Sequence, residues 1–91
     1  MLTEDAQMLI KYMPEAVNAL AAKLLHKFDQ RILYGVHEGE IIKTPTGCRM
    51  EVQIFPLYDQ EEIFPDCTVQ VLRNSVTGET SVGWWENNHA Q

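Results

Sequence analysis

The chain has 91 residues, of which 45% are hydrophobic and 22% charged, so it is long enough for one small globular domain and too apolar for a disordered segment. Lys and Arg number 7 against 13 Asp and Glu, which gives a formal net charge of −6. Because phosphate groups are bound by basic surfaces, this balance argues against direct binding to nucleic acid or to an anionic membrane.

The first third of the chain predicts two helices. Apolar side chains recur with the 3.6-residue period of a helix at Leu2, Ala6, Leu9, Ile10 and Met13. Thr3 is a suitable N-cap for this segment. A proline disfavours the α conformation of the residue before it and is well tolerated in a first turn, so we expect one helix to end near Met13 and a second to begin at Pro14. The second helix carries the clearest apolar stripe, from Val17 to Phe28.

The rest of the chain predicts antiparallel hairpins. Turn-forming residues at positions 44–47 and 74–79 each separate two segments that alternate between polar and apolar side chains. These four segments are Glu40–Lys43, Arg49–Ile54, Thr68–Arg73 and Thr80–Trp85. Ile32–Val36 is a candidate fifth strand. The expected fold class is therefore α+β, with two N-terminal helices packed on one face of a four-stranded, or with this segment five-stranded, antiparallel sheet.

The net charge divides the single domain of residues 1–91 into two halves. Residues 1–34, the helical half, carry four basic and four acidic side chains and are neutral. Residues 35–91, the β half, carry three basic and nine acidic side chains. The whole excess of acid therefore lies in the β half.

The loop between the two hairpins is the candidate partner-binding surface. Its acids would steer encounter with a basic partner, and the aromatic side chains at its edges would supply contact area. Trp85 joins this set because adjacent side chains of a strand point to opposite faces, and Trp84, which shares its face with Val82, is the expected core residue. The candidate partner-binding residues are Tyr58, Asp59, Glu61, Glu62, Phe64 and Trp85. The alternative is an ordinary solvated loop.

The back of the second helix is the candidate surface for self-association. Ala19, Ala22 and His26 form an almost uncharged strip opposite the apolar stripe. This strip could seat the first helix, or the same helix of a second copy in a homodimer, as small domains often gain stability by pairing. The alternative is that alanine is present only as a good helix former.

No motif specifies a chemistry. His37 and Glu38 stand without a second His or a Cys pair at metal-ligand spacing, so we expect no catalytic residue, no metal and no cofactor. Cys48 and Cys67 would lie about 20 Å apart in an antiparallel strand pair, which predicts two free, buried thiols. The acidic start of the chain and the short apolar runs argue against a signal peptide or a membrane span, so we expect a cytoplasmic protein.

These features favour a non-enzymatic protein-binding module whose partner has a basic surface. By analogy of composition, its size and lack of catalytic motifs are typical of phage or mobile-element regulators and inhibitors, here with an acidic face against a basic groove. The alternative is a small-molecule-binding or catalytic domain with a pocket near His37, between helices and sheet. In that case Tyr34, His37 and Glu38 would supply polar groups and Trp85 a stacking surface.

Overall fold

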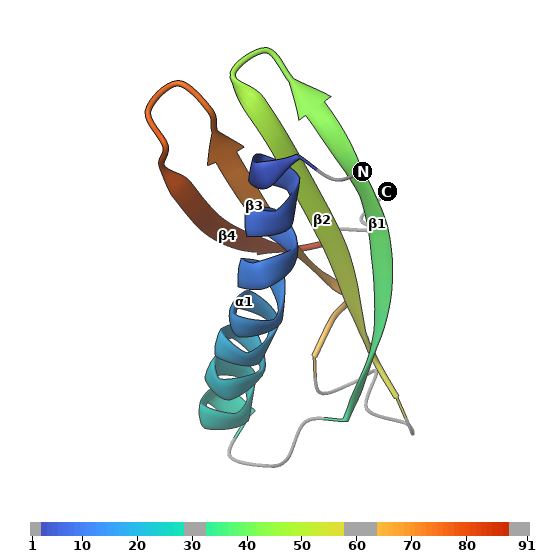
Figure 1. Cartoon of the computed structure of the whole chain (residues 1–91). Coiled ribbons are helices and arrows are strands. Elements are labelled where there is room, and N and C mark those ends of the chain that lie inside the picture. The colour runs from blue at the N-terminus through green and yellow to red at the C-terminus, as the bar shows by residue number, and fades with distance from the viewer. Residues whose placement is uncertain (1–2, 29–32, 58–63, 88–91) are drawn as a thin grey trace.

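The computed structural model describes residues 3–28, 33–57 and 64–87, without the side chains at positions 25, 26 and 28. In these ranges one helix and four strands follow one another: α1 (Glu4–Phe28), β1 (Tyr34–Thr44), β2 (Gly47–Pro56), β3 (Cys67–Asn74) and β4 (Thr80–Glu86). The strands form one antiparallel sheet in the order β1-β2-β3-β4, and α1 lies along one face of it (Figure 1). The α+β class and the four-stranded antiparallel sheet are therefore confirmed.

The expectation of two N-terminal helices is wrong, because α1 continues without a break through Pro14. A proline inside a helix removes one backbone hydrogen bond and costs about 3 kcal/mol relative to alanine. Leu9 and Met13 before the proline are buried against the same sheet as Leu20 after it. Burying each such side chain contributes about 1.5–3 kcal/mol, so the packing of one continuous stripe outweighs the proline.

The predicted N-cap of the helix is confirmed, and a polar cluster fastens this end of α1 to the β3–β4 hairpin. The amide of Ala6 donates to Oγ1 of Thr3 at 3.1 Å. Ser75 Oγ donates to Oδ2 of Asp5 at 2.7 Å, and Arg73 Nε donates to Oδ1 of Asp5 at 3.0 Å. These hydrogen bonds, that of Ser75 first, hold the pKa of the Asp5 carboxyl below its ordinary value.

The candidate fifth strand is not a separate element. Tyr34–Val36 forms the beginning of β1, and Ile32 lies outside the described residues. The strand then runs on through a bulge between Glu38 and Ile41, where two residues stand opposite one residue of β2. An extra residue breaks the period of two, which is why the alternation in the sequence does not reveal one continuous strand.

Both predicted turns close hairpins. At the first, a Cβ on Gly47 would collide with the carbonyl oxygen of Arg73 in the neighbouring strand, so only glycine fits this close approach. At the second, the amide of Gly78 donates to the Asn74 carbonyl at 2.8 Å, and Gly78 has a φ of 76°, a conformation that favours glycine.

The core lies between α1 and the middle of the sheet. Its fully buried side chains are Leu9, Leu20, Val52, Ile54, Phe64, Cys67, Val69 and Val71. Cys48 and Cys67 are buried free thiols, as predicted. Cys48 stands opposite Arg73 and Cys67 opposite Ile54, so the two thiols occupy opposite ends of the β2–β3 pair. Burial raises the pKa of both thiols.

Candidate functional site

The single helix covers only the middle of the sheet. Its backbone lies closest to β3 and also near β2 and β4, whereas it stands farther from β1. Four strands at their usual spacing span about 19 Å, whereas a helix with its side chains is about 10–12 Å across. One helix therefore leaves part of this face uncovered, including the part over β1.

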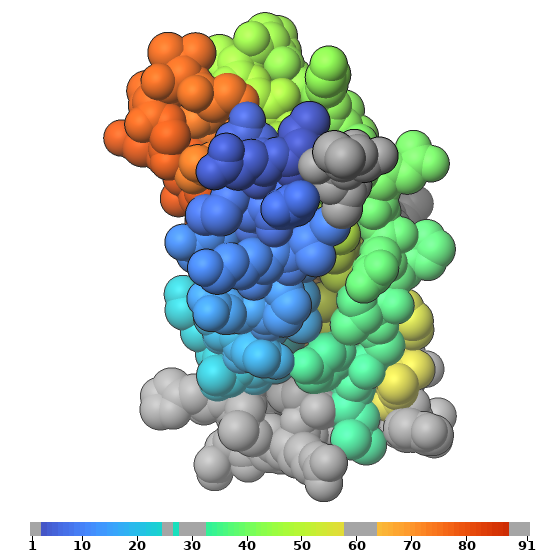
Figure 2. All heavy atoms as spheres, viewed as in Figure 1, coloured from blue at the N-terminus to red at the C-terminus, as the bar shows by residue number. Residues whose placement is uncertain are grey.

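A groove of about 790 Å³ occupies this uncovered part. Figure 2 shows it as a furrow between α1 (blue) and β1 (green), with atoms of β2 (olive) at its floor. Its lining is mainly apolar. The helix contributes Ile10, Met13, Pro14 and Val17, and β2 contributes Met50 and Val52.

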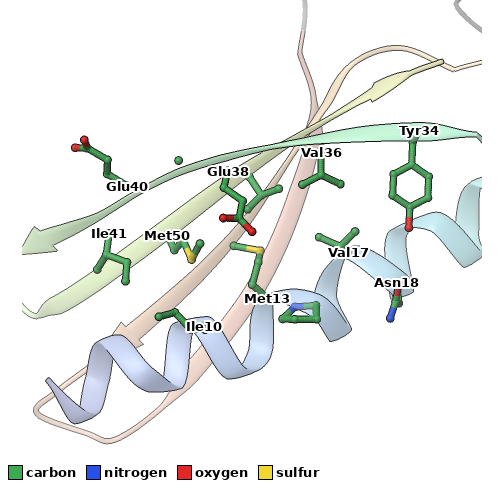
Figure 3. A pocket seen from close by; sticks show the side chains of 13 residues that line it. Ile10, Met13, Val17, Asn18, Tyr34, Val36, Glu38, Glu40, Ile41 and Met50 are labelled. Atoms are coloured by element: carbon green, nitrogen blue, oxygen red, sulfur yellow. The ribbon is translucent and has the colours of Figure 1, made fainter. Parts of the chain in front are cut away.

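The strand β1 forms the other wall through alternate side chains. Tyr34, Val36 and Glu38 follow one another at a spacing of two and all point toward α1 (Figure 3). After the bulge, Ile41 returns to the same face, opposite Met50. Val36 lies on the face of the sheet that α1 packs against, but α1 does not cover it, so 45% of its surface is exposed.

Among the described residues, Glu38 and Glu40 are the only charged ones that line the groove. The carboxylate of Glu38 points into it, whereas that of Glu40 points outward at the rim (Figure 3). Within the described ranges, no side chain donates a hydrogen bond or an ion pair to Glu38. In addition, the carbonyl of Ile10 lacks its usual helical donor, because Pro14 has no N–H. The groove therefore combines an apolar surface with an exposed carboxylate and a backbone carbonyl, both of which can accept hydrogen bonds from a cation or another donor.

The candidate partner-binding residues fall into three groups. Tyr58, Asp59, Glu61 and Glu62 lie outside the described residues. Phe64 is only 1% exposed and belongs to the core, so its ring is not available at the surface, contrary to its expected place at the edge of an exposed loop. The reason is that Phe64 is a large apolar side chain close to the beginning of β3, where it can pack under α1. Trp85 lies on the sheet face away from α1 and is 43% exposed.

The candidate self-association residues lie on α1. Ala19 and Ala22 are exposed, and the side chain of His26 lies outside the described part of the chain. The first of the two expected occupants of this strip, a separate N-terminal helix, does not exist as such, because that segment is the beginning of α1 itself.

Trp84 differs from its expected place in the core. It shares the helix-covered face with Val82, as the alternation predicts, since the two residues stand opposite the buried Val69 and Val71. Even so, 40% of Trp84 and 53% of Val82 are exposed. The cause is that α1 packs mainly on β3 and contacts β4 less, so it leaves both side chains partly exposed.

The four residues of the alternative pocket are divided between the two faces of the sheet. Tyr34 and Glu38 line the groove, whereas His37 and Trp85 lie on the opposite face. His37 and Trp85 also stand at the two edges of the sheet, three strand spacings or about 14 Å apart. A groove between helix and sheet does exist, but only two of these four residues contribute to it.

Two further features of the described ranges concern metal binding and membrane insertion. No three His, Cys, Asp or Glu side chains among residues 3–28, 33–57 and 64–87 lie close enough together to hold a metal ion. The helix in these ranges is not long and apolar enough to cross a membrane. Comparisons with family models, with curated proteins and with solved structures return no match.

Proposed function

We propose that the protein is a non-enzymatic protein-binding module that takes a basic, amphipathic helix of a partner protein into the groove between α1 and β1. The observation that carries this proposal is the composition of the groove: its lining is mainly apolar, and the charged residues in the described part of that lining are Glu38 and Glu40. Grooves of this kind bind helices through their apolar faces.

The dimensions of the sheet favour a helix as the occupant. Packed helices lie about 8–10 Å apart, which is about two strand spacings, so a partner helix beside α1 would lie over β1 and complete a two-helix layer. Its apolar face would cover Val36 and Ile10, which are 45% and 44% exposed. Met13 and Met50 in the lining have flexible side chains that adapt to different apolar surfaces.

The charges favour a basic helix. A Lys or Arg beside the apolar stripe of the partner would meet the carboxylate of Glu38, and a second would meet Glu40 at the rim. The free carbonyl of Ile10 would accept a further hydrogen bond. The net charge of −6 also steers a basic partner toward this protein, and added salt would weaken this attraction.

The finer form of the proposal is a cytoplasmic regulator or inhibitor of the kind that phages and mobile elements use against basic partners. The acidic composition supports it. The two free thiols are consistent with a reducing compartment.

Two synthetic peptides test the proposed binding. Both have the same leucine stripe over about 18 residues, or five helical turns, and carry either Lys or Glu at the polar positions. Labelled with a fluorophore, they are titrated with the protein and followed by anisotropy. We expect the Lys peptide to bind, its affinity to fall as salt rises, and the Glu peptide not to bind.

A matched pair of variants separates the groove from general attraction to an acidic protein. Val36 and Ile42 are 45% and 44% exposed and lie on opposite faces of β1. Val36→Lys places a cation in the groove and should lower the affinity for the Lys peptide by at least about tenfold. This factor corresponds to a loss of about 1.4 kcal/mol in binding free energy. Ile42→Lys changes the net charge equally and should leave the affinity nearly unchanged. Equal effects of the two substitutions, or equal binding of the two peptides, would refute the proposal.

The volume of the groove favours a second candidate, a site for a small cationic amphiphile. About 790 Å³ lies within the range of small-molecule pockets, and the Tyr34 and Glu38 side chains add polar groups to the lining. Dodecyltrimethylammonium below its micellar concentration is a suitable probe. If it binds saturably and Glu38→Gln weakens it while the Lys peptide does not bind, this function replaces the first.

A further inference from the structure

The outer edge of β4 is a second uncovered part of the molecule, separate from the groove. β1 and β4 are the two edge strands of the sheet. β1 has two features that natural edge strands use against pairing, namely a bulge and the charges of Glu38, Glu40 and Lys43. β4 has no bulge, no proline and no charged residue before Glu86, and every residue from Ser81 to Glu86 is exposed.

The hydrogen bonds to β3 establish which backbone groups of β4 have no partner among the residues that the structure describes. The amide of Asn74 donates to the Glu79 carbonyl at 2.9 Å, and the amide of Asn87 donates to the Asp66 carbonyl at 2.8 Å. Hydrogen-bonded positions of an antiparallel pair alternate, so Ser81, Gly83 and Trp85 bond to β3. The N–H and C=O groups of the remaining four residues therefore point to the free edge. These residues are Thr80, Val82, Trp84 and Glu86.

We propose that β4 pairs in antiparallel orientation with β4 of a second copy of this chain, about a two-fold axis at Gly83, and so joins the two sheets into one. In this register Val82 stands opposite Trp84 of the second copy, and Thr80 stands opposite Glu86. All four free positions then find partners. An axis at Val82 or at Trp84 would leave part of this edge unpaired.

The side chains of β4 suit this register. Two pairs of Val82 and Trp84 form on the helix-covered face, and aromatic rings pair well with β-branched side chains across strands. Each Glu86 meets a neutral Thr80, so no like charges stand opposite each other. The pairing would cover apolar surface that α1 leaves open, since Trp84 and Val82 are 40% and 53% exposed.

The position of α1 also permits this dimer. The helix lies over β3, so the two helices would stand about three strand spacings or 14 Å apart, with the tryptophans and valines of both copies between them. Ala19 lies half a turn around α1 from Ile10, on the flank away from the groove, and its short side chain leaves this space open. The groove at the opposite edge stays free, so the dimer does not depend on the proposed binding function.

A disulfide across the two-fold axis is the direct test. Gly83 would face Gly83 of the second copy at a non-hydrogen-bonded pair, where Cα atoms are about 4.5 Å apart and within disulfide range. A Cβ at Gly83 meets no atom within 4 Å, so Gly83→Cys should fold as the wild type does. Ser81→Cys is the matched control, because it lies on the same strand and face but opposite Trp85. Under a mild oxidant at micromolar concentration, we expect Gly83→Cys to form a reducible dimer in at least about tenfold higher yield than Ser81→Cys.

Sedimentation equilibrium of the wild type gives the second readout, because it involves no substitution. At tens of micromolar, we expect the wild type to have twice the mass of one chain. Val82→Lys should have the mass of one chain. Val76→Lys, the control, adds the same charge to the exposed hairpin turn and should remain a dimer. A monomeric wild type, or equal cross-linking of the two cysteine variants, would overturn the proposal. If Ala22→Glu dissociates the dimer and Gly83→Cys does not cross-link it, the two copies pair through the helix. That result would also overturn the proposal.

Discussion

Replacing Pro14 with alanine tests the continuous helix and the groove together. Pro14 is exposed, so alanine removes no buried side chain and supplies an N–H for the carbonyl of Ile10. A proline inside a helix destabilises the folded state by about 3 kcal/mol relative to alanine. Alanine also gives the unfolded chain more conformational freedom, which stabilises the unfolded state by about 0.4–1 kcal/mol and offsets part of this gain. We therefore expect Pro14→Ala to raise the free energy of unfolding by about 2 kcal/mol.

Urea denaturation followed by far-UV circular dichroism measures this change. For a domain of this size, about 2 kcal/mol corresponds to a rise in Tm of about 10 °C. Glu15→Ala is the control, since it changes an exposed neighbour without altering the backbone, and its effect should stay within about 0.5 kcal/mol. A neutral or destabilising Pro14→Ala would refute the reasoning, because it would mean that residue 14 does not lie inside one continuous helix.

The same substitution should weaken the groove as a binding site. Once the carbonyl of Ile10 accepts a helical hydrogen bond from the new N–H at position 14, it is no longer free for a partner. One hydrogen bond contributes about 0.5–1.5 kcal/mol, so the Lys peptide should bind about two- to tenfold more weakly. A gain in stability with a loss in binding is the pattern expected where a local folding rule is broken at a functional site.

Three further expectations concern stability and can be measured in the same denaturation assay. Gly47→Ala should destabilise the fold by about 1–3 kcal/mol, because its Cβ would collide with the Arg73 carbonyl, whereas Gly83→Ala meets open space and should be nearly neutral. Leu20→Ala removes a fully buried side chain and should cost about 2–5 kcal/mol. The pKa of Asp5 is lower in the folded state than in the unfolded state, so its contribution is present above about pH 4 and is lost as the pH falls through the folded pKa. Wild type and Asp5→Asn should therefore differ in stability at neutral pH and converge in acid.

The sheet could be predicted from the sequence because its signals are local. Met50, Val52 and Ile54 alternate with polar residues, and turn-forming residues stand between the strands. Short turns force β1 and β2, and likewise β3 and β4, into antiparallel pairs. An antiparallel pairing of β2 with β3, which are joined by a longer segment, predicts two separate free thiols at Cys48 and Cys67, and both the pairing and the free thiols are confirmed.

The helix could not be predicted correctly from the same local rules. The proline at position 14 is a real local obstacle, but burial on both sides of it along one sheet is a tertiary effect that overrides it. The bulge in β1 similarly hides a long strand behind a break in the alternation.

The groove over β1 is open because one helix covers the sheet, whereas the local patterns of the sequence predict two. Two helices would have covered the sheet and buried Val36 and Ile10, whereas one helix leaves them at a surface. Their apolar side chains look like core residues in the sequence, and only the width of the sheet relative to one helix distinguishes the two cases. Of the residues named for a possible pocket, Tyr34 and Glu38 line the groove, whereas His37 lies on the other face of the sheet.

The most direct test of helix binding in the groove is methyl NMR of the methionines during titration with the Lys peptide. Met13 and Met50 line the groove, whereas Met8 on the same helix does not and serves as an internal control. We expect the methyl signals of Met13 and Met50 to shift saturably while that of Met8 stays in place. Binding of the peptide with a shift at Met8 and none at Met13 and Met50 would contradict the proposed site.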